Sequence, residues 1–332
     1  MTGWPVGSGT CVLWVGAISL FAASALAQNA STQAPTSSPK SVETVIVTGR
    51  KPAADIDAVV SHFVASHATP NRKTGQYMRL DLGPVCPATN GLPPAFDKFV
   101  TTRVLAVATS VGAKTDASGK CTPNVEILFT DRPAALIGAL AEKTRGEILG
   151  VHYAHERASL LEVTHPIQGW YITGTRYDDY STDTAVSFGV DGTARDTYDR
   201  GEVLDDAYYR APEQMVLNSH IPMRRISSIA HVLILADINK VGGREIGPVS
   251  DYIAMLALSQ PPSLDDCNEL PSILDLMSST CGTRPKPQAL TASDIAYLKA
   301  LYATDLGATT ISAQTKKIDD AMKNNLDDHG PE

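Results

Sequence analysis

The chain lacks an intact copy of any common catalytic motif. It contains no His-Glu-x-x-His, the sequence that helical zinc peptidases use to place two histidines and a water-activating glutamate together. It also contains no Gly-x-Ser-x-Gly turn for a serine nucleophile. The glycines Gly242 and Gly243 precede Arg244 and Glu245 rather than the Lys-Ser/Thr of a phosphate-binding loop, which indicates a simple turn. These absences leave no catalytic or cofactor-binding residue to name and argue against an enzyme.

Cysteine is scarce, and one of the five residues, Cys11, lies in the apolar N-terminal segment. The other four, Cys86, Cys121, Cys267 and Cys281, form no Cys-x-x-Cys pair, which argues against a four-cysteine metal site. An even number of cysteines in an exported chain indicates disulfides, for which three pairings are possible. We expect Cys86–Cys121 and Cys267–Cys281, because these pairings close the shortest loops.

No Lys or Arg precedes the apolar run at residues 12–20, where a signal peptide usually carries a basic residue. The run is nevertheless followed by Ala25-Leu26-Ala27, which places small residues at the −3 and −1 positions of a cleavage site before Gln28. It is also too short for a stable membrane span. We therefore predict a signal peptide at residues 1–27, no membrane span after its removal, and a periplasmic or secreted protein.

Basic side chains are outnumbered, with 28 Lys and Arg against 36 Asp and Glu, and the formal net charge is −8. Nucleic acid and anionic membrane surfaces both require a basic face, so the charge argues against these partners. Hydrophobic residues make up 43% of the chain. The roughly 300 residues that follow the signal peptide can therefore build a sizeable core.

Residues 28–53 are rich in Ser, Thr, Pro, Gln and Ala, a composition that predicts a disordered leader. Within it, residues 42–50 (Val-Glu-Thr-Val-Ile-Val-Thr-Gly-Arg) resemble the segment that opens many TonB-dependent outer-membrane receptors. Such receptors need a long series of alternating strands, which this chain lacks. Three interpretations remain for the segment from Glu43 to Arg50: it contacts an envelope protein, it docks on a sheet edge, or it has no role. The sequence does not identify a binding partner.

Residues 54–325 have the hydrophobic pattern of a single α+β domain, and residues 326–332 are expected to be a frayed tail. Elements follow one another without a βαβ rhythm, which favours a mixed sheet packed with helices over a doubly wound fold. The apolar run at 232–235 predicts a strand buried on both faces. The predicted helices are 56–64, 96–111, 133–143, 248–259, 292–302 and 311–323, and the predicted strands are 125–130, 169–175, 184–190 and 226–237.

The only dense histidine cluster is His152-Tyr153-Ala154-His155-Glu156. Histidines three residues apart can share a helix face, so His152, His155 and Glu156 form an alternative metal site. The polar residues around them favour a solvated turn instead. The acidic run at 177–183 lacks the glycine and the closing glutamate of a calcium-binding EF-hand loop, and it indicates a hairpin tip.

Three segments of the C-terminal half follow an order that resembles the metzincin-type zinc metallopeptidases and exported bacterial proteins related to them. In those peptidases a strand precedes the active-site helix, a Ser-Ile/Val-Met-like turn lies beneath the metal, and a Leu-Thr-x-x-Asp helix ending in Leu-Tyr closes the domain. The resemblance implies a metzincin-like C-terminal half. The corresponding segments are the strand and helix within 231–259, Pro271-Ser272-Ile273-Leu274-Asp275-Leu276-Met277, and the helix that follows Leu290-Thr291-Ala292-Ser293-Asp294 and ends in Leu301-Tyr302.

The zinc motif of that family is absent, because residues 249–256 read Val-Ser-Asp-Tyr-Ile-Ala-Met-Leu. A catalytic zinc site needs about three protein ligands, which Asp251 alone cannot supply. We expect Asp251 to line a wet cleft or to pair with a donor such as Arg244 or a backbone amide. The resulting hypothesis is an exported, non-catalytic binding or structural protein without a cofactor or metal. The alternative is a metallopeptidase-like hydrolase with a non-standard site.

Overall fold

The computed structural model describes residues 53–71, 75–116, 120–144, 146–151, 155, 157–178, 224–282, 284–305 and 310–329. These residues belong to one compact unit, which spans residues 50–332. The predicted signal peptide, the leader with its TonB-like segment, and the strand expected at 184–190 lie outside the described residues. Among the described helices, none combines the length and the apolar composition that a membrane crossing requires.

A mixed four-stranded sheet lies at the centre of the described residues. Strands β1 (Pro87–Asn90), β2 (Val125–Thr130) and β4 (Arg224–Asp237) run parallel to one another. Strand β3 (Ile167–Asp178) is antiparallel to β4, and the strand order is β1-β2-β4-β3. The predicted α+β class with a mixed sheet is confirmed.

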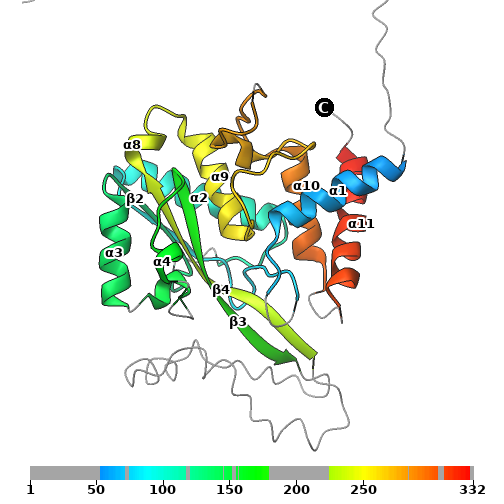
Figure 1. Ribbon diagram of the computed structural model, residues 1–332, viewed down its shortest axis with the longest axis horizontal. Helices are drawn as coiled ribbons and strands as arrows, with labels where there is room; N and C mark the ends of the chain where they lie inside the picture. The colour runs from blue at the N-terminus through cyan, green and yellow to red at the C-terminus, as the bar shows by residue number, and fades with distance from the viewer. Residues whose placement is uncertain are drawn as a thin grey trace, which may run out of the picture. The chain divides into compact units, whose positions relative to one another are not determined.

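Helices cover the sheet, and several pack in pairs (Figure 1). α9 packs against α2, α10 packs against α11, and α11 packs against α1. The helical elements are α1 (Ala53–His67), α2 (Pro94–Ser110), α3 (Pro133–Lys143), η1 (Glu147–Leu149), α4 (Arg157–Leu160), α8 (Ile238–Val241), α9 (Ile246–Leu258), η2 (Ile273–Leu276), α10 (Ala292–Ala303) and α11 (Ile311–His329).

Strand β4 is buried on both faces, as its continuous apolar run predicted. Val232 and Ile234 belong to the main core cluster, which also contains residues of α1, α2, α9, α10 and α11. Leu233 and Leu235 belong to a second cluster with Trp170 of β3 and residues of α3 and η1. Because successive residues of a strand point to opposite faces, the sheet separates these two cores.

Helix α9 is a core helix, since every residue from Pro248 to Leu258 is buried. A helix that is apolar on all sides has no solvent face and must be enclosed by other elements. It follows β4 through α8, where the Asp237 side chain caps the first turn by accepting a hydrogen bond from the Asn239 N–H at 3.0 Å. The turn predicted at Gly242 and Gly243 then leads into α9, and Gly243 has φ of 82°.

Helix α11 is longer than predicted. It continues through residues 326–329, which were expected to belong to a frayed tail. Two contacts explain the difference. Asn325 Nδ2 donates to the Ala296 carbonyl of α10 at 3.2 Å, and Leu326 packs against the main core. α11 is also tied to α1, where Lys323 Nζ lies 2.9 Å from Asp57 Oδ1.

Strand β1 was not predicted, because its sequence Pro-Ala-Thr-Asn has none of the apolar alternation that identifies a strand. Two contacts hold β1 in the sheet. The strand pairs in parallel with β2, and the residue before it, Cys86, is bonded to Cys121. Tertiary contacts therefore decide its conformation.

Candidate functional site

Asp251 is the one charged residue of α9, and three donors bind its carboxylate. It accepts hydrogen bonds from Arg103 Nε at 2.5 Å, from Arg103 Nη2 at 2.9 Å and from the Leu290 N–H at 3.0 Å. Its side chain is 2% exposed, so it is buried in the protein rather than lining a wet cleft. The expected backbone amide takes part, but the cationic partner is Arg103 rather than Arg244. The reason is that α2 packs along α9, whereas Arg244 lies on an exposed turn.

The residues of α9 do not fit the zinc ion that the metzincin resemblance implies. A catalytic zinc site requires about three nitrogen, sulfur or carboxylate ligands. α9 contains no histidine, cysteine or glutamate, and three donors already occupy its only carboxylate. Its burial and composition make α9 part of the core rather than a metal-binding helix.

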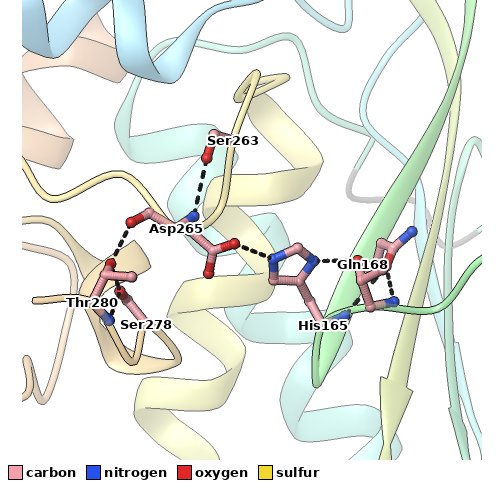
Figure 2. A network of polar contacts seen from close by, with 7 residues as sticks. His165, Gln168, Ser263, Asp265, Ser278 and Thr280 are labelled. Carbon is pink, nitrogen blue, oxygen red and sulfur yellow. Dashed lines mark hydrogen bonds and ion pairs between the residues drawn. The ribbon is translucent and has the colours of Figure 1, made fainter.

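A partly exposed polar cluster connects the start of β3 with the loop that follows α9 (Figure 2). His165 Nε2 lies 3.1 Å from Asp265 Oδ2, and His165 Nδ1 lies 2.8 Å from Thr164 Oγ1. The His165 side chain is 26% exposed and that of Asp265 is 57% exposed, so water reaches both. We refer to Thr164, His165, Gln168 and Asp265 as the His165 cluster.

Asp265 determines the direction of the hydrogen bonds in the His165 cluster. An ionised carboxylate only accepts, so Nε2 of neutral His165 carries the proton, and Nδ1 accepts from the Thr164 hydroxyl. The Thr164 hydroxyl also lies 3.3 Å from Gln168 Oε1. Each ring nitrogen of His165 therefore has a hydrogen-bond partner.

The loop that carries Asp265 is held by hydroxyl groups on both sides (Figure 2). The Asp265 N–H donates to Ser263 Oγ at 3.2 Å, and the Thr280 hydroxyl donates to the Asp265 carbonyl. Tyr252 of α9 adds a further polar group, because its hydroxyl is buried and has no hydrogen-bond partner among the described residues. Burial raises the pKa of Tyr252, and the charge of Asp265 raises it further. Tyr252 is thus electrostatically coupled to the cluster.

A second polar network is completely buried and links α1, η2 and α10. His67 Nε2 lies 3.0 Å from Ser272 Oγ, and the Ser272 hydroxyl donates to Asp294 Oδ1 at 2.7 Å. Asp294 Oδ2 accepts from the N–H groups of Ile273 and Thr291. Burial lowers the pKa of His67 to about 4 and raises the pKa of Asp294 to about 6. Ser272, His67 and Asp294 together join three segments of the chain. None of the three is more than 1% exposed, so a substrate cannot reach them.

Neither of these two networks was identified from the sequence. His165 and Asp265 are 100 positions apart, and His67 and Ser272 are 205 positions apart. The one local signal was the capping box at Thr291 and Asp294, which the structure contains. It marks the start of α10 but gives no indication that Asp294 also contacts Ser272.

The cysteines form one of the two predicted disulfides. Cys86 and Cys121 are bonded, as expected. Cys267 and Cys281 are free thiols instead, which differs from the predicted bond. Their sulfur atoms and a carboxylate oxygen of Asp275 all lie within 4.8 Å of one another, so this pair is adjacent although not bonded.

Two residues of the histidine cluster suggested as an alternative metal site, His152 and Glu156, lie outside the described residues. The third, His155, is exposed. Another histidine, His231, lies with its Nε2 atom 3.5 Å from Glu126 Oε1. The hydrogen bond from His231 lowers the pKa of Glu126.

The chain was compared with protein-family models, curated proteins and solved structures, and none of them matches it.

Proposed function

We propose that the chain is an exported, non-catalytic relative of the metzincin-type peptidases, acting as a binding or structural protein. The observation that carries this proposal is the buried carboxylate of Asp251, which accepts three hydrogen bonds from the protein. In a zinc peptidase the helix after the central strand presents ligands, whereas here its only charged group is used to hold α2 and the Leu290 segment. The succession of β4, α9, the turn at 272–277 and α10 supports the scaffold.

The His165 cluster is the binding surface that this proposal favours. It combines solvent access with a group that can make a further hydrogen bond, the second carboxylate oxygen of Asp265. The Asp265 carboxylate suits a ligand that carries hydrogen-bond donors, such as a protonated amine or a basic peptide.

The metal-free, non-catalytic assignment is tested on the purified mature protein. We expect elemental analysis to find no stoichiometric zinc, and we expect no chelator-sensitive hydrolysis of an unfolded protein substrate, with or without added zinc. One equivalent of tightly bound zinc that is released by Asp251→Asn, together with zinc-dependent hydrolysis, would contradict the proposal.

The binding surface is tested by thermal shift with a panel of basic, neutral and acidic dipeptides. Basic dipeptides are expected to raise the melting temperature of the parent, and Asp265→Asn is expected to abolish that rise. The matched control is Asp266→Asn, which removes a neighbouring exposed charge outside the His165 cluster. An equal loss in both variants would indicate general electrostatic attraction rather than a site.

A hydrolase with a non-standard site is the second candidate, and the chain Thr164–His165–Asp265 favours it. A hydroxyl, an imidazole and a carboxylate lie in series at 2.8 and 3.1 Å, the order of groups that activates a hydroxyl or a water molecule as a nucleophile. The test is ester and amide hydrolysis by the parent, His165→Gln and Thr164→Val. Activity lost in both variants supports this candidate, and an inactive parent excludes it for the substrates used.

A further inference from the structure

The segments before and after η2 bring two thiols and a carboxylate together. Cys267 lies in the loop after α9 and is exposed, whereas Cys281 follows η2 and is buried. The Cys281 thiol donates a hydrogen bond to Asp275 Oδ1 at 3.1 Å, and the Cys267 sulfur lies within 4.8 Å of both the Cys281 sulfur and an Asp275 carboxylate oxygen. Lys286 Nζ donates to the carbonyls of Asp275 and Ser278 at 2.8 and 2.6 Å, which fixes the turn between η2 and Cys281.

We propose that Cys267, Asp275 and Cys281 form a reversible dithiol–disulfide site that exchanges with disulfide-containing molecules. Cys267 is the accessible thiol, Cys281 is the resolving thiol, and Asp275 is the proton acceptor for Cys281. The proposal rests on this cluster alone and is independent of the function proposed above.

The exchange balances as two successive displacements. Cys267 loses its proton to water, and the thiolate attacks one sulfur of an external disulfide, which forms a mixed disulfide and releases a thiolate that takes a proton from water. Cys281 then transfers its proton to Asp275 and attacks the Cys267 sulfur, which closes the internal disulfide and releases a second thiolate that takes the proton from Asp275. The protein loses two electrons and two protons, and the external disulfide is reduced to two thiols.

The environment of Cys281 stabilises the reduced form of the pair. Burial, with smaller contributions from the neighbouring Cys267 and Asp275, raises the pKa of Cys281 to about 11. A thiol that is held protonated and hydrogen-bonded favours the dithiol state, and stabilising the dithiol makes the corresponding disulfide easier to reduce. Cys86 and Cys121 differ, because they are already bonded to each other.

The site also has the two features that exchange requires. Cys267 is open to an incoming disulfide, and the two sulfur atoms are close enough to bond after a small movement of the loop. The carboxylate of Asp275 is 3% exposed and lies at the thiol that must lose a proton. An acceptor in contact with the resolving thiol speeds the closing step.

To test this, the full mature protein is equilibrated in buffers that contain reduced and oxidised glutathione at a series of ratios. Free thiols are then alkylated, and the disulfides are mapped by mass spectrometry. We expect Cys267 and Cys281 to convert together between dithiol and disulfide in a two-electron transition. Cys86–Cys121 should remain oxidised across the same buffers.

Variants separate the three roles. Cys281→Ser should stop the reaction at the mixed disulfide between Cys267 and glutathione, and Cys267→Ser should leave Cys281 unreactive. Asp275→Asn removes the proton acceptor for Cys281. Closure of the internal disulfide should therefore slow about tenfold or more. The control is Asp266→Asn, which removes an exposed charge directly before Cys267 in the same loop and should leave the closure rate unchanged.

Three outcomes would overturn the proposal. The first is a Cys267–Cys281 disulfide that opens only where Cys86–Cys121 also opens, which would make it a fixed structural bond. The second is a pair that stays reduced in excess oxidised glutathione. The third is a tightly bound metal ion that blocks alkylation of both thiols.

Discussion

His67 and Asp294 lie at opposite ends of a buried hydrogen-bond chain through Ser272, and burial shifts their pKa values in opposite directions. The pKa of His67 falls from 6.5 to about 4, whereas that of Asp294 rises from 3.8 to about 6. Between pH 4 and 6 the unfolded chain binds a proton at His67 that the folded protein does not. Over the same interval the folded protein binds a proton at Asp294 that the unfolded chain does not, so the two contributions to stability oppose each other.

Asp294→Asn should make the protein less stable in acid relative to the parent. The raised pKa of Asp294 stabilises the fold at low pH, and this contribution is lost as the pH rises through about 6. Without it, the free energy of unfolding relative to the parent should fall by about 1.4 kcal/mol per pH unit from pH 6 to pH 4. Urea unfolding of both proteins at several pH values measures this slope.

His67→Gln should have the reverse effect. Its lowered pKa makes His67 stabilising above about pH 6.5, and this contribution is lost as the pH falls towards 4. The stability of the variant relative to the parent should therefore rise by about 1.4 kcal/mol per pH unit on acidification. Slopes of the same sign in the two variants would contradict the opposed pKa shifts.

Arg103→Met should destabilise the fold by about 3 kcal/mol, because it leaves the buried carboxylate of Asp251 with only the Leu290 amide. Asp251→Asn should cost less, since the Arg103 side chain is 43% exposed and can turn to water. Chemical denaturation measures both values. Arg244→Met is the matched control, an exposed arginine near the start of α9, and an equal loss in the control would contradict the importance of the Arg103–Asp251 pair.

Thr291→Ala should cost about 1 kcal/mol of stability, because Thr291 Oγ1 accepts the Asp294 N–H at 3.1 Å and caps α10. Thr291→Ser keeps the hydroxyl and should retain most of that energy. If the two variants unfold at the same denaturant concentration, the hydroxyl does not act as a cap.

The mature protein is expected to begin at Gln28, after the small residues Ala25 and Ala27. Expression of the whole chain in a bacterium, separation of the cell fractions and N-terminal sequencing test this directly. Export with a start at Gln28 is the expected result. A cytoplasmic product that retains residues 12–20 would contradict the signal peptide.

Sequence patterns predicted the elements that bury an apolar stripe or run. β2 and α3 have the predicted bounds, and the apolar run of β4 led to its central position. β1 has no such pattern and is positioned by pairing with β2. The candidate sites could not be predicted from the sequence, because they too lack a repeating pattern. Single residues such as His165 and Asp265 have no periodicity, and only the folded chain brings them together.

The contact between α1 and α11 joins helices from opposite ends of the described residues. Asp57 and Lys323, which connect the two helices, are separated by 266 positions, and residues of both helices share the main core cluster. Contacts this distant in sequence form slowly, because a long loop must close first. If the chain crosses a membrane from its N-terminal end, α1 arrives long before its partner. A chaperone that holds α1 during this interval would protect the chain from aggregation.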